Sequence, residues 1–256
     1  MSAVLFALSI ALLVFFVRRD LAEYNAFRLL TATRDRQRHY RIWVATGFIL
    51  FFLYPLLGLA CIHRTAALLH FPVELAPAAL ALRSHMPSGD GGKAVLYGFL
   101  ASLTAGLLLG IFLAPRLRRS RRSLVLESVE PLMPRNPAEL AHTAALSLNA
   151  GLSEEVFFRL FLPMLGLQLH FGWLASLLLA GLLFGLVHIY QGVAGVVSTT
   201  MLGLFLTVAY LLSGSLWLAV GLHIGLDLIQ VVVRPGLRMY YAQRVAKPDD
   251  AQSSAS

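Results

Sequence analysis

Long apolar runs separated by short polar stretches dominate the sequence. A helix that crosses a lipid bilayer needs about 20 mostly apolar residues in succession. Seven runs approach or reach that length, at residues 2–17, 42–61, 94–114, 138–169, 172–189, 192–212 and 215–233. The pattern therefore predicts an all-α fold, a polytopic bundle of about seven transmembrane helices.

Residues 65–82 form a less regular segment, which leaves the number of spans at seven or eight. This segment contains Glu74, Pro72 and Pro77. A charge is costly in hydrocarbon, and proline interrupts the hydrogen bonds of a helix. We expect a surface or re-entrant segment here rather than a simple span.

The basic residues lie in three main groups outside the apolar runs, at residues 18–41, 116–135 and 234–247. Cytoplasmic loops of membrane proteins are enriched in Lys and Arg. Seven spans with the N-terminus outside and the C-terminus inside put all three groups in the cytoplasm, where the lipid bilayer offers anionic lipids as partners. This anchoring explains the net charge of +8, and we expect no nucleic-acid partner.

The composition supports an integral, multi-pass membrane protein. Residues of the set AVILMFWYC make up 58 % of the chain and charged residues only 13 %, compared with about 25 % charged in a soluble domain. Residues 2–17 lack the basic start and the cleavage site of a signal peptide, so we expect a retained first helix. The single cysteine, Cys61, excludes an intrachain disulfide and a cysteine-based metal site. Short loops without an organelle-targeting signal favour the bacterial inner membrane.

The chain divides into three parts. Residues 1–137 hold the N-terminal transmembrane helices and their basic cytoplasmic loops, and they end in a connector with three prolines. Residues 138–235 form a four-helix transmembrane core. Residues 236–256 form a cytoplasmic tail that we expect to be partly disordered, because its end is small and polar.

Ionisable side chains at the centres or ends of the apolar runs are confined to this core. Insertion of a charged side chain into a bilayer costs roughly 2.5–3.5 kcal/mol, so such residues tend to be functional. The residues concerned are Glu154, Glu155, Arg159, His188, His223 and Asp227. Their restriction to the C-terminal part indicates that the chemistry lies there.

Helical spacing predicts how several of these residues pair. Ser153 can cap a helix start, with the two following glutamates in the first turn. Glu155 and Arg159 are four residues apart, so they share a face, while Glu154 is rotated by about 100° from that face. His223 and Asp227 also share a helix face.

The predicted topology brings Glu154, His188 and His223 to one cavity that opens to the cytoplasmic side. A carboxylate and imidazoles in a cavity with little water can supply a general base and oxyanion donors. The same side chains, together with Asp227, can hold a divalent metal such as Zn²⁺.

The order and spacing of these residues resemble the three-motif signature of the CAAX-protease and bacteriocin-processing family (the CPBP or Abi family, related to the Rce1-type prenyl-protein endopeptidases). The resemblance covers roughly residues 140–233 and rests on three motifs, Glu154-Glu155-x-x-x-Arg159, Phe184-x-x-x-His188 and His223-x-x-x-Asp227. It implies an intramembrane endopeptidase whose core is catalytic.

The resemblance also implies a role for each motif residue. Glu154 activates the attacking water with help from His188, and the last motif stabilises the oxyanion. The implied catalytic residues are Glu154, His188, His223 and Asp227, and the implied supporting residues are Glu155, Arg159 and Phe184.

Asp227 departs from the family pattern, because many members have Asn at this position. An ionised Asp would repel an oxyanion, so Asp227 is protonated, orients His223 or binds a metal. The family has been described both as metalloproteases and as glutamate-type proteases. The chain lacks the His-Glu-x-x-His zinc motif.

The expected activity is hydrolysis of a peptide bond in a membrane-anchored or lipidated protein or peptide. Two other functions are compatible with the sequence. A non-catalytic scaffold or bacteriocin-immunity protein would retain the fold without activity. A small proton-coupled transporter would use the same ionisable residues as a proton relay.

Overall fold

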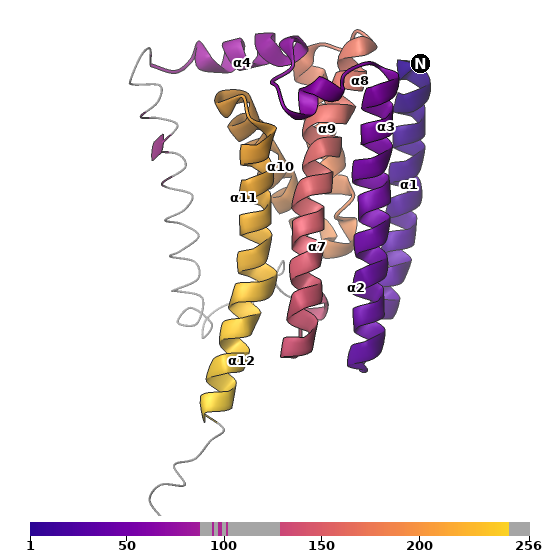
Figure 1. Cartoon of the computed structure of the whole chain (residues 1–256), viewed down its shortest axis with the longest axis vertical. Helices are drawn as coiled ribbons and strands as arrows, with labels where there is room; N and C mark the ends of the chain where they lie inside the picture. The colour runs from indigo at the N-terminus through magenta and orange to yellow at the C-terminus, as the bar shows by residue number, and fades with distance from the viewer. Residues whose placement is uncertain (88–93, 95–96, 99–100, 102–128, 246–256) are drawn as a thin grey trace, which may run out of the picture.

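The computed structural model describes residues 1–87, 94, 97–98, 101 and 129–245. Helices are the only regular elements within these ranges, and the long ones run side by side along one axis (Figure 1). This confirms the predicted all-α fold. The predicted run 94–114 and the residues after 245 lie largely or wholly outside the described residues.

Long continuous helices form the body of the bundle. Helix α1 covers Ser2–Phe27, and a second helix is built from α2 (Thr33–Phe48), the π-helical η1 (Ile49–Leu53) and α3 (Tyr54–Cys61). The C-terminal part contains α7 (Pro137–Glu155), the π-helical η5 (Val156–Phe161), α8 (Leu162–Gln168), α9 (Trp173–Leu186), α10 (Gly192–Ser213), α11 (Leu216–Leu228), the π-helical η7 (Ile229–Val233) and α12 (Arg234–Val245).

Within the described ranges, four helical stretches are long and apolar enough to cross a membrane by length and composition. They are Ser2–Phe27, Thr33–Cys61, Ile189–Ser213 and Leu216–Gln243, and the shorter Trp173–Leu186 is also apolar. This supports an integral membrane protein. The total of seven spans and the orientation of the termini stay predictions.

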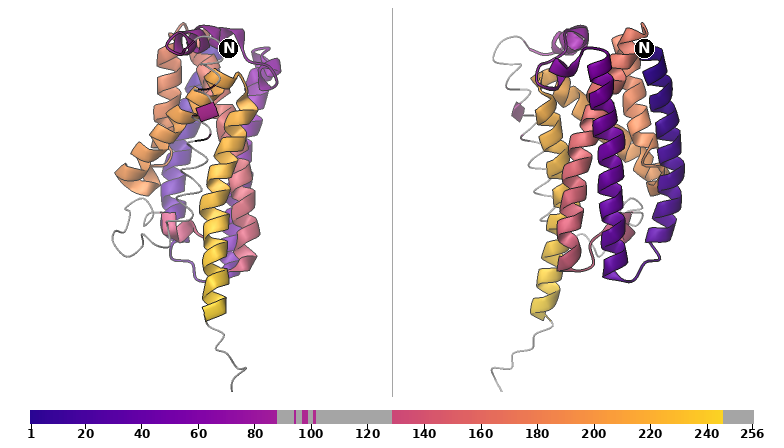
Figure 2. Two further views of the ribbon diagram at one scale, coloured as in Figure 1. Left: turned by 90° about the vertical axis from the view of Figure 1, so that its left-hand side faces the viewer. Right: turned by 45° about the vertical axis from the view of Figure 1, so that its right-hand side comes forward.

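The segment after α3 contains only short helices. These are the 3-10 turns η2 (Thr65–Leu68) and η3 (Val73–Leu75) and the eight-residue α4 (Ala76–Arg83). Helix α4 lies across one end of the bundle in each view (Figures 1 and 2). The expected surface segment is therefore present, and these residues form no spanning helix.

Two predicted helix boundaries are wrong. The first helix does not end at residue 17 but continues to Phe27, because charged residues end an apolar run without ending a helix. No helix starts at Ser153: the helix begins at Pro137, where Asn136 accepts a hydrogen bond from the Glu139 backbone N–H. A capping Asn followed by Pro is a strong start signal, and the Ser153 hydroxyl instead donates to the Asn149 carbonyl.

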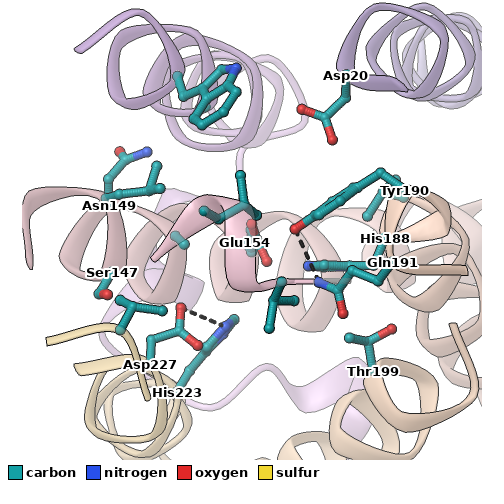
Figure 3. Close-up of a pocket in the computed structure, with 18 of the residues that line it drawn as sticks. Asp20, Ser147, Asn149, Glu154, His188, Tyr190, Gln191, Thr199, His223 and Asp227 are labelled. Atoms are coloured by element: carbon teal, nitrogen blue, oxygen red, sulfur yellow. Dashed lines mark hydrogen bonds and ion pairs between the residues drawn. The ribbon is translucent and has the colours of Figure 1, made fainter. Parts of the chain in front are cut away.

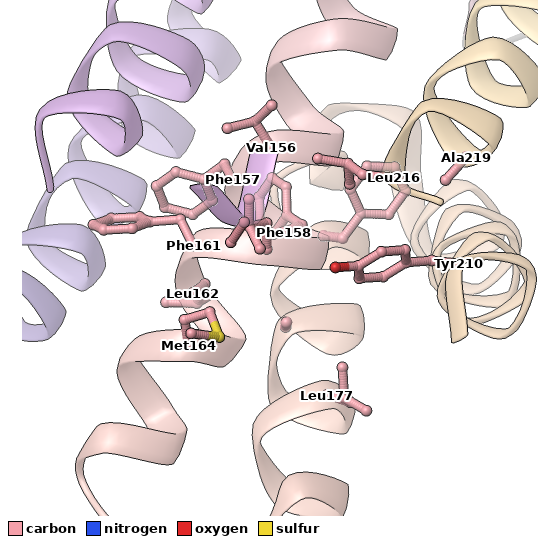
Figure 4. Close-up of a cluster of buried hydrophobic side chains, with 14 of the residues drawn as sticks. Val156, Phe157, Phe158, Phe161, Leu162, Met164, Leu177, Tyr210, Leu216 and Ala219 are labelled. Atoms are coloured by element: carbon pink, nitrogen blue, oxygen red, sulfur yellow. The ribbon is translucent and has the colours of Figure 1, made fainter. Parts of the chain in front are cut away.

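The centre of the bundle is the π-helical segment Val156–Phe161, in which every residue is buried. Figure 4 shows its aromatic side chains packed between neighbouring helices. Phe158 meets Phe184 of α9 with ring centroids 5.3 Å apart, and Phe161 meets Tyr54 of α3 at 5.5 Å. Helices from both halves of the chain therefore pack against the turn that directly follows the two glutamates.

Small residues let the motif-bearing helices approach closely. A Cβ atom at Gly151 on α7 would lie 2.8 Å from the backbone nitrogen of Ile224 on α11. At Gly185 on α9 it would lie 2.9 Å from the carbonyl oxygen of Val196 on α10. Such contacts are typical of membrane helix pairs, where packing rather than the hydrophobic effect drives association.

We expect Gly151→Ala to lower the free energy of unfolding by about 1–3 kcal/mol, the usual effect of overpacking. Its added methyl group meets backbone atoms of α11, which cannot rotate away. Gly225→Ala is the matched control, because nothing lies within 4 Å of a Cβ at that position. Unfolding of both variants in the same detergent tests this, and equal stability of the two would contradict the packing described here.

A buried ion pair joins the N-terminal helices to the C-terminal part. The Nε atom of Arg36 on α2 lies 3.1 Å from Glu139 Oε2 at the start of α7, and both side chains are buried. Arg36 also donates to the Tyr40 hydroxyl and to the carbonyls of Pro131 and Met133. One guanidinium thus fixes α2, α7 and the chain before α7 in a single arrangement.

Arg36→Met should destabilise the protein by about 3–5 kcal/mol, because it leaves the Glu139 carboxylate buried without its charged partner. Arg38→Met serves as the control, since Arg38 is exposed on the same helix. The midpoints of thermal unfolding measure the difference. Similar midpoints would show that the pair does not hold the two parts together.

Candidate active site

The four residues predicted to be catalytic line one cavity of about 470 Å³. Figure 3 shows Glu154, His188, His223 and Asp227 around this pocket. They come from α7, the turn after α9, and α11, so the expected convergence of three separate helical segments is present. Their catalytic roles are a separate matter and stay a proposal.

Glu155 is the centre of a buried charged cluster. Its Oε1 atom lies 3.0 Å from Arg159 Nη1 and 2.7 Å from His223 Nδ1, and all three side chains are buried. The expected pair of Glu155 and Arg159 is therefore present. The contact with His223, 68 residues away in sequence, joins α7 directly to α11.

The Arg159 guanidinium is enclosed by α9 and α10. It lies 4.2 Å above the centroid of the Phe184 ring and donates to the Gly203 carbonyl at 3.4 Å. A Cβ atom at Gly203 would come within 2.7 Å of the Phe184 ring. Phe184, predicted as a supporting residue, thus forms one face of the arginine site, and Gly203 leaves room for it.

Glu154 has a different environment from its neighbour. Successive residues of a helix differ by about 100° in direction. Glu154 accordingly points into the cavity (Figure 3), while Glu155 points to Arg159 and His223. Oε2 of each glutamate is buried and has no hydrogen-bond partner, but of the two residues only Glu154 lines the cavity. A buried carboxylate oxygen without a partner is unusual, because it loses its hydration without compensation.

His188 is held by the backbone of its own turn. Its Nδ1 atom lies 2.8 Å from the carbonyl oxygen of Phe184. A carbonyl can only accept a hydrogen bond, so Nδ1 carries the proton, and Nε2 of the neutral ring is then an acceptor. His188 therefore offers the cavity a hydrogen-bond acceptor next to Glu154.

His223 is held between two carboxylates. Its Nδ1 faces Glu155, and its Nε2 lies 3.8 Å from Asp227 Oδ2. Figure 3 marks the contact with Asp227, which lies one turn further along the same helix. Of the roles left open for Asp227 by the sequence, this contact fits orientation of the His223 ring.

A family model described as Rce1-like, type II CAAX prenyl endopeptidase, matches residues 136–229. The chain carries a domain of the CAAX protease family. Comparisons with curated proteins and with solved structures gave no match. The matched segment begins at the Asn136 cap and contains all three motifs, which supports a CAAX protease-type intramembrane endopeptidase in general.

The sequence left open a metal held by Glu154, His188, His223 and Asp227. Among the described residues, no group of three or more His, Cys, Asp or Glu side chains is arranged to hold a metal ion. The arrangement does not fit a metal held by the four catalytic candidates, so the proposed steps use protein groups alone.

Several lining residues were not singled out by the sequence. Asp20 of α1 and Tyr190 and Gln191 of the 3-10 turn η6 (Ile189–Gln191) all line the cavity (Figure 3). Asp20 lies beyond residue 17, where the apolar run ends, and so falls in the predicted loop. Tyr190 and Gln191 lie two and three residues after a motif histidine, and this proximity is the signal that could have identified them.

Amide substitution should lower the free energy of unfolding much more at Glu155 than at Glu154. Glu155→Gln should lower the free energy of unfolding by about 3–5 kcal/mol, because it removes the charge shared by buried Arg159 and His223. Glu154→Gln should change it by less than about 1 kcal/mol, since no partner of Oε2 is lost. Thermal unfolding of both variants in one detergent provides the measurement, and equal losses would refute the division of roles.

Proposed function

We propose that this protein hydrolyses a peptide bond of a membrane-anchored or lipidated protein or peptide, and that Glu154 activates the attacking water. The observation that carries the proposal is the partnerless Glu154 carboxylate oxygen in a cavity that also contains His188 and His223. A general base must be within hydrogen-bond reach of the water that it deprotonates. Oε2 of Glu154 is such an acceptor, since it has no hydrogen-bond partner and Glu154 lines the cavity.

The proposed reaction uses each motif in turn. Glu154 takes a proton from water while His188 Nε2 accepts the second hydrogen bond and orients the molecule. The water oxygen then bonds to the scissile carbonyl carbon, and a tetrahedral intermediate with an oxyanion forms. Glu154 returns the proton to the leaving amine as the C–N bond breaks.

His223 and Asp227 are proposed to serve the oxyanion. Glu155 fixes the His223 ring through Nδ1, and Asp227 faces Nε2. When the ring carries both protons, Nε2 can donate to an oxyanion in the cavity. Glu155, Arg159 and Phe184 would then act by holding this ring and the following turn in place.

We also propose seven spans, with the N-terminus outside and the C-terminus in the cytoplasm of a bacterial inner membrane. Arg28, Arg135 and Arg238, from three separate basic regions, line a single cavity at one end of the bundle. This end would face anionic lipids of the cytoplasmic leaflet. The active-site cavity reaches toward it, because Leu132 and Arg234 are among its lining residues.

Glu154→Gln should abolish cleavage while the folded protein remains in the membrane. Mass spectrometry of membrane proteins from cells that express the wild type, this variant or no protein should reveal a terminus that is processed only by the wild type. Glu130→Gln is a suitable control, because it removes the same charge at an exposed site outside the cavity. Identical membrane proteomes in the three strains would favour a scaffold, and loss of pH-driven flux without any cleavage product would favour a transporter.

A further inference from the structure

Tyr190 places a phenol in the active-site cavity from outside the three motifs. The Gln191 side-chain amide donates a hydrogen bond to the Tyr190 oxygen at 3.0 Å (Figure 3). Because this oxygen accepts from Gln191, the hydroxyl proton of Tyr190 remains available for another acceptor. The hydroxyl is directed to the same part of the cavity as the Glu154 carboxylate (Figure 3).

The backbone and neighbouring rings hold this phenol in one position. Gly192 has a φ of +74°, a left-handed conformation that side-chain-bearing residues rarely adopt. A Cβ atom at Gly195 would lie 2.2 Å from the Gln191 side chain, so glycine there makes room for Gln191. The Tyr190 ring packs against Tyr24 of α1 with centroids 5.3 Å apart.

Four other hydroxyls of the cavity already use their protons. Those of Ser147, Ser153, Ser198 and Thr199 each donate to a carbonyl of the same helix. The indole N–H of Trp43 also has an acceptor, the Glu23 carboxylate. Tyr190 therefore differs from these groups in having a positioned donor proton that no described contact uses.

The electrostatics of the cavity make such a donor necessary. Glu154, Asp227, Asp20 and Glu23 supply four carboxyl groups to the lining, and carboxylates oppose a further negative charge nearby. A tetrahedral intermediate places an oxyanion in this surrounding. Uncharged donors that are fixed before the reaction stabilise such an oxyanion without reorganisation.

We propose that Tyr190 is a further catalytic residue, whose hydroxyl donates a hydrogen bond to the oxyanion of the tetrahedral intermediate. Gln191 is a positioning residue that fixes the direction of this hydroxyl. The phenol keeps its proton throughout, so the balance of bonds and protons is that of hydrolysis by Glu154. This inference rests on the proposed endopeptidase function.

The Tyr190→Phe variant tests the proposal with an internally quenched, farnesylated Cys-a-a-X peptide as the probe. Its kcat should fall about 10²–10³-fold, the usual effect of losing one oxyanion donor, while KM stays within about twofold. Tyr210→Phe is the matched control: Tyr210 is a buried tyrosine outside the cavity, and its hydroxyl has no hydrogen-bond partner. It should keep the full kcat.

The Gln191→Leu variant separates positioning from general structural damage. Its kcat should fall about tenfold, the effect of one neutral hydrogen bond. The double variant with Tyr190→Phe should be no slower than Tyr190→Phe alone, because the two residues act through one hydroxyl. Multiplied losses in the double variant would overturn the positioning role.

The outcomes distinguish the two proposals. Wild-type cleavage that is lost in Glu154→Gln but retained in full by Tyr190→Phe overturns the role of Tyr190 and leaves the endopeptidase function standing. A rise in KM at constant kcat also overturns it, because the residue would then bind substrate and transition state equally. If the wild type cleaves no better than Glu154→Gln, the proposed hydrolysis of this probe fails, and the role of Tyr190 falls with it.

Discussion

The shared carboxylate of Glu155 is the constraint on which the site depends. A charged group buried without a partner costs several kcal/mol, so Arg159 and His223 must both stay close to this carboxylate. One partner lies one turn further along the central helix and the other on α11, which fixes the distance and rotation between the two helices. The neighbouring Glu154 is then directed into the cavity, since the helix turns by about 100° per residue.

Buried aromatic side chains pack around this charged cluster and hold its geometry. The π-helical turn Val156–Phe161 follows the glutamates directly and is buried throughout, and π-helical turns often occur at functional sites. Phe184 connects the two regions, because its ring contacts Phe158, the Arg159 guanidinium and the His223 ring. A motif aromatic thus positions two ionised or ionisable groups without forming a hydrogen bond to either.

Sequence reasoning identified four residues that line the cavity because ionisable groups in apolar runs are conspicuous. It paired Glu155 with Arg159 because helical spacing is local information. It could not find the contact of Glu155 with His223, since a separation of 68 residues leaves no periodic signal. The run at 138–169 begins close to the observed helix start at Pro137, but Ser153 does not cap a helix, because Ser can also bond to a carbonyl of the preceding turn. Tyr190 and Asp20 were missed because polar residues at the end of an apolar run are usually interfacial.

The N-terminal helices contribute to the cavity although they lie outside the matched domain. The motifs of residues 136–229 supply the charged groups, but Phe16, Asp20 and Trp43 of the first two helices form part of the wall. The ion pair of Arg36 with Glu139 connects this wall to the start of α7. The shape and lining of the cavity therefore depend on residues 1–61 as well as on the helices that carry the three motifs.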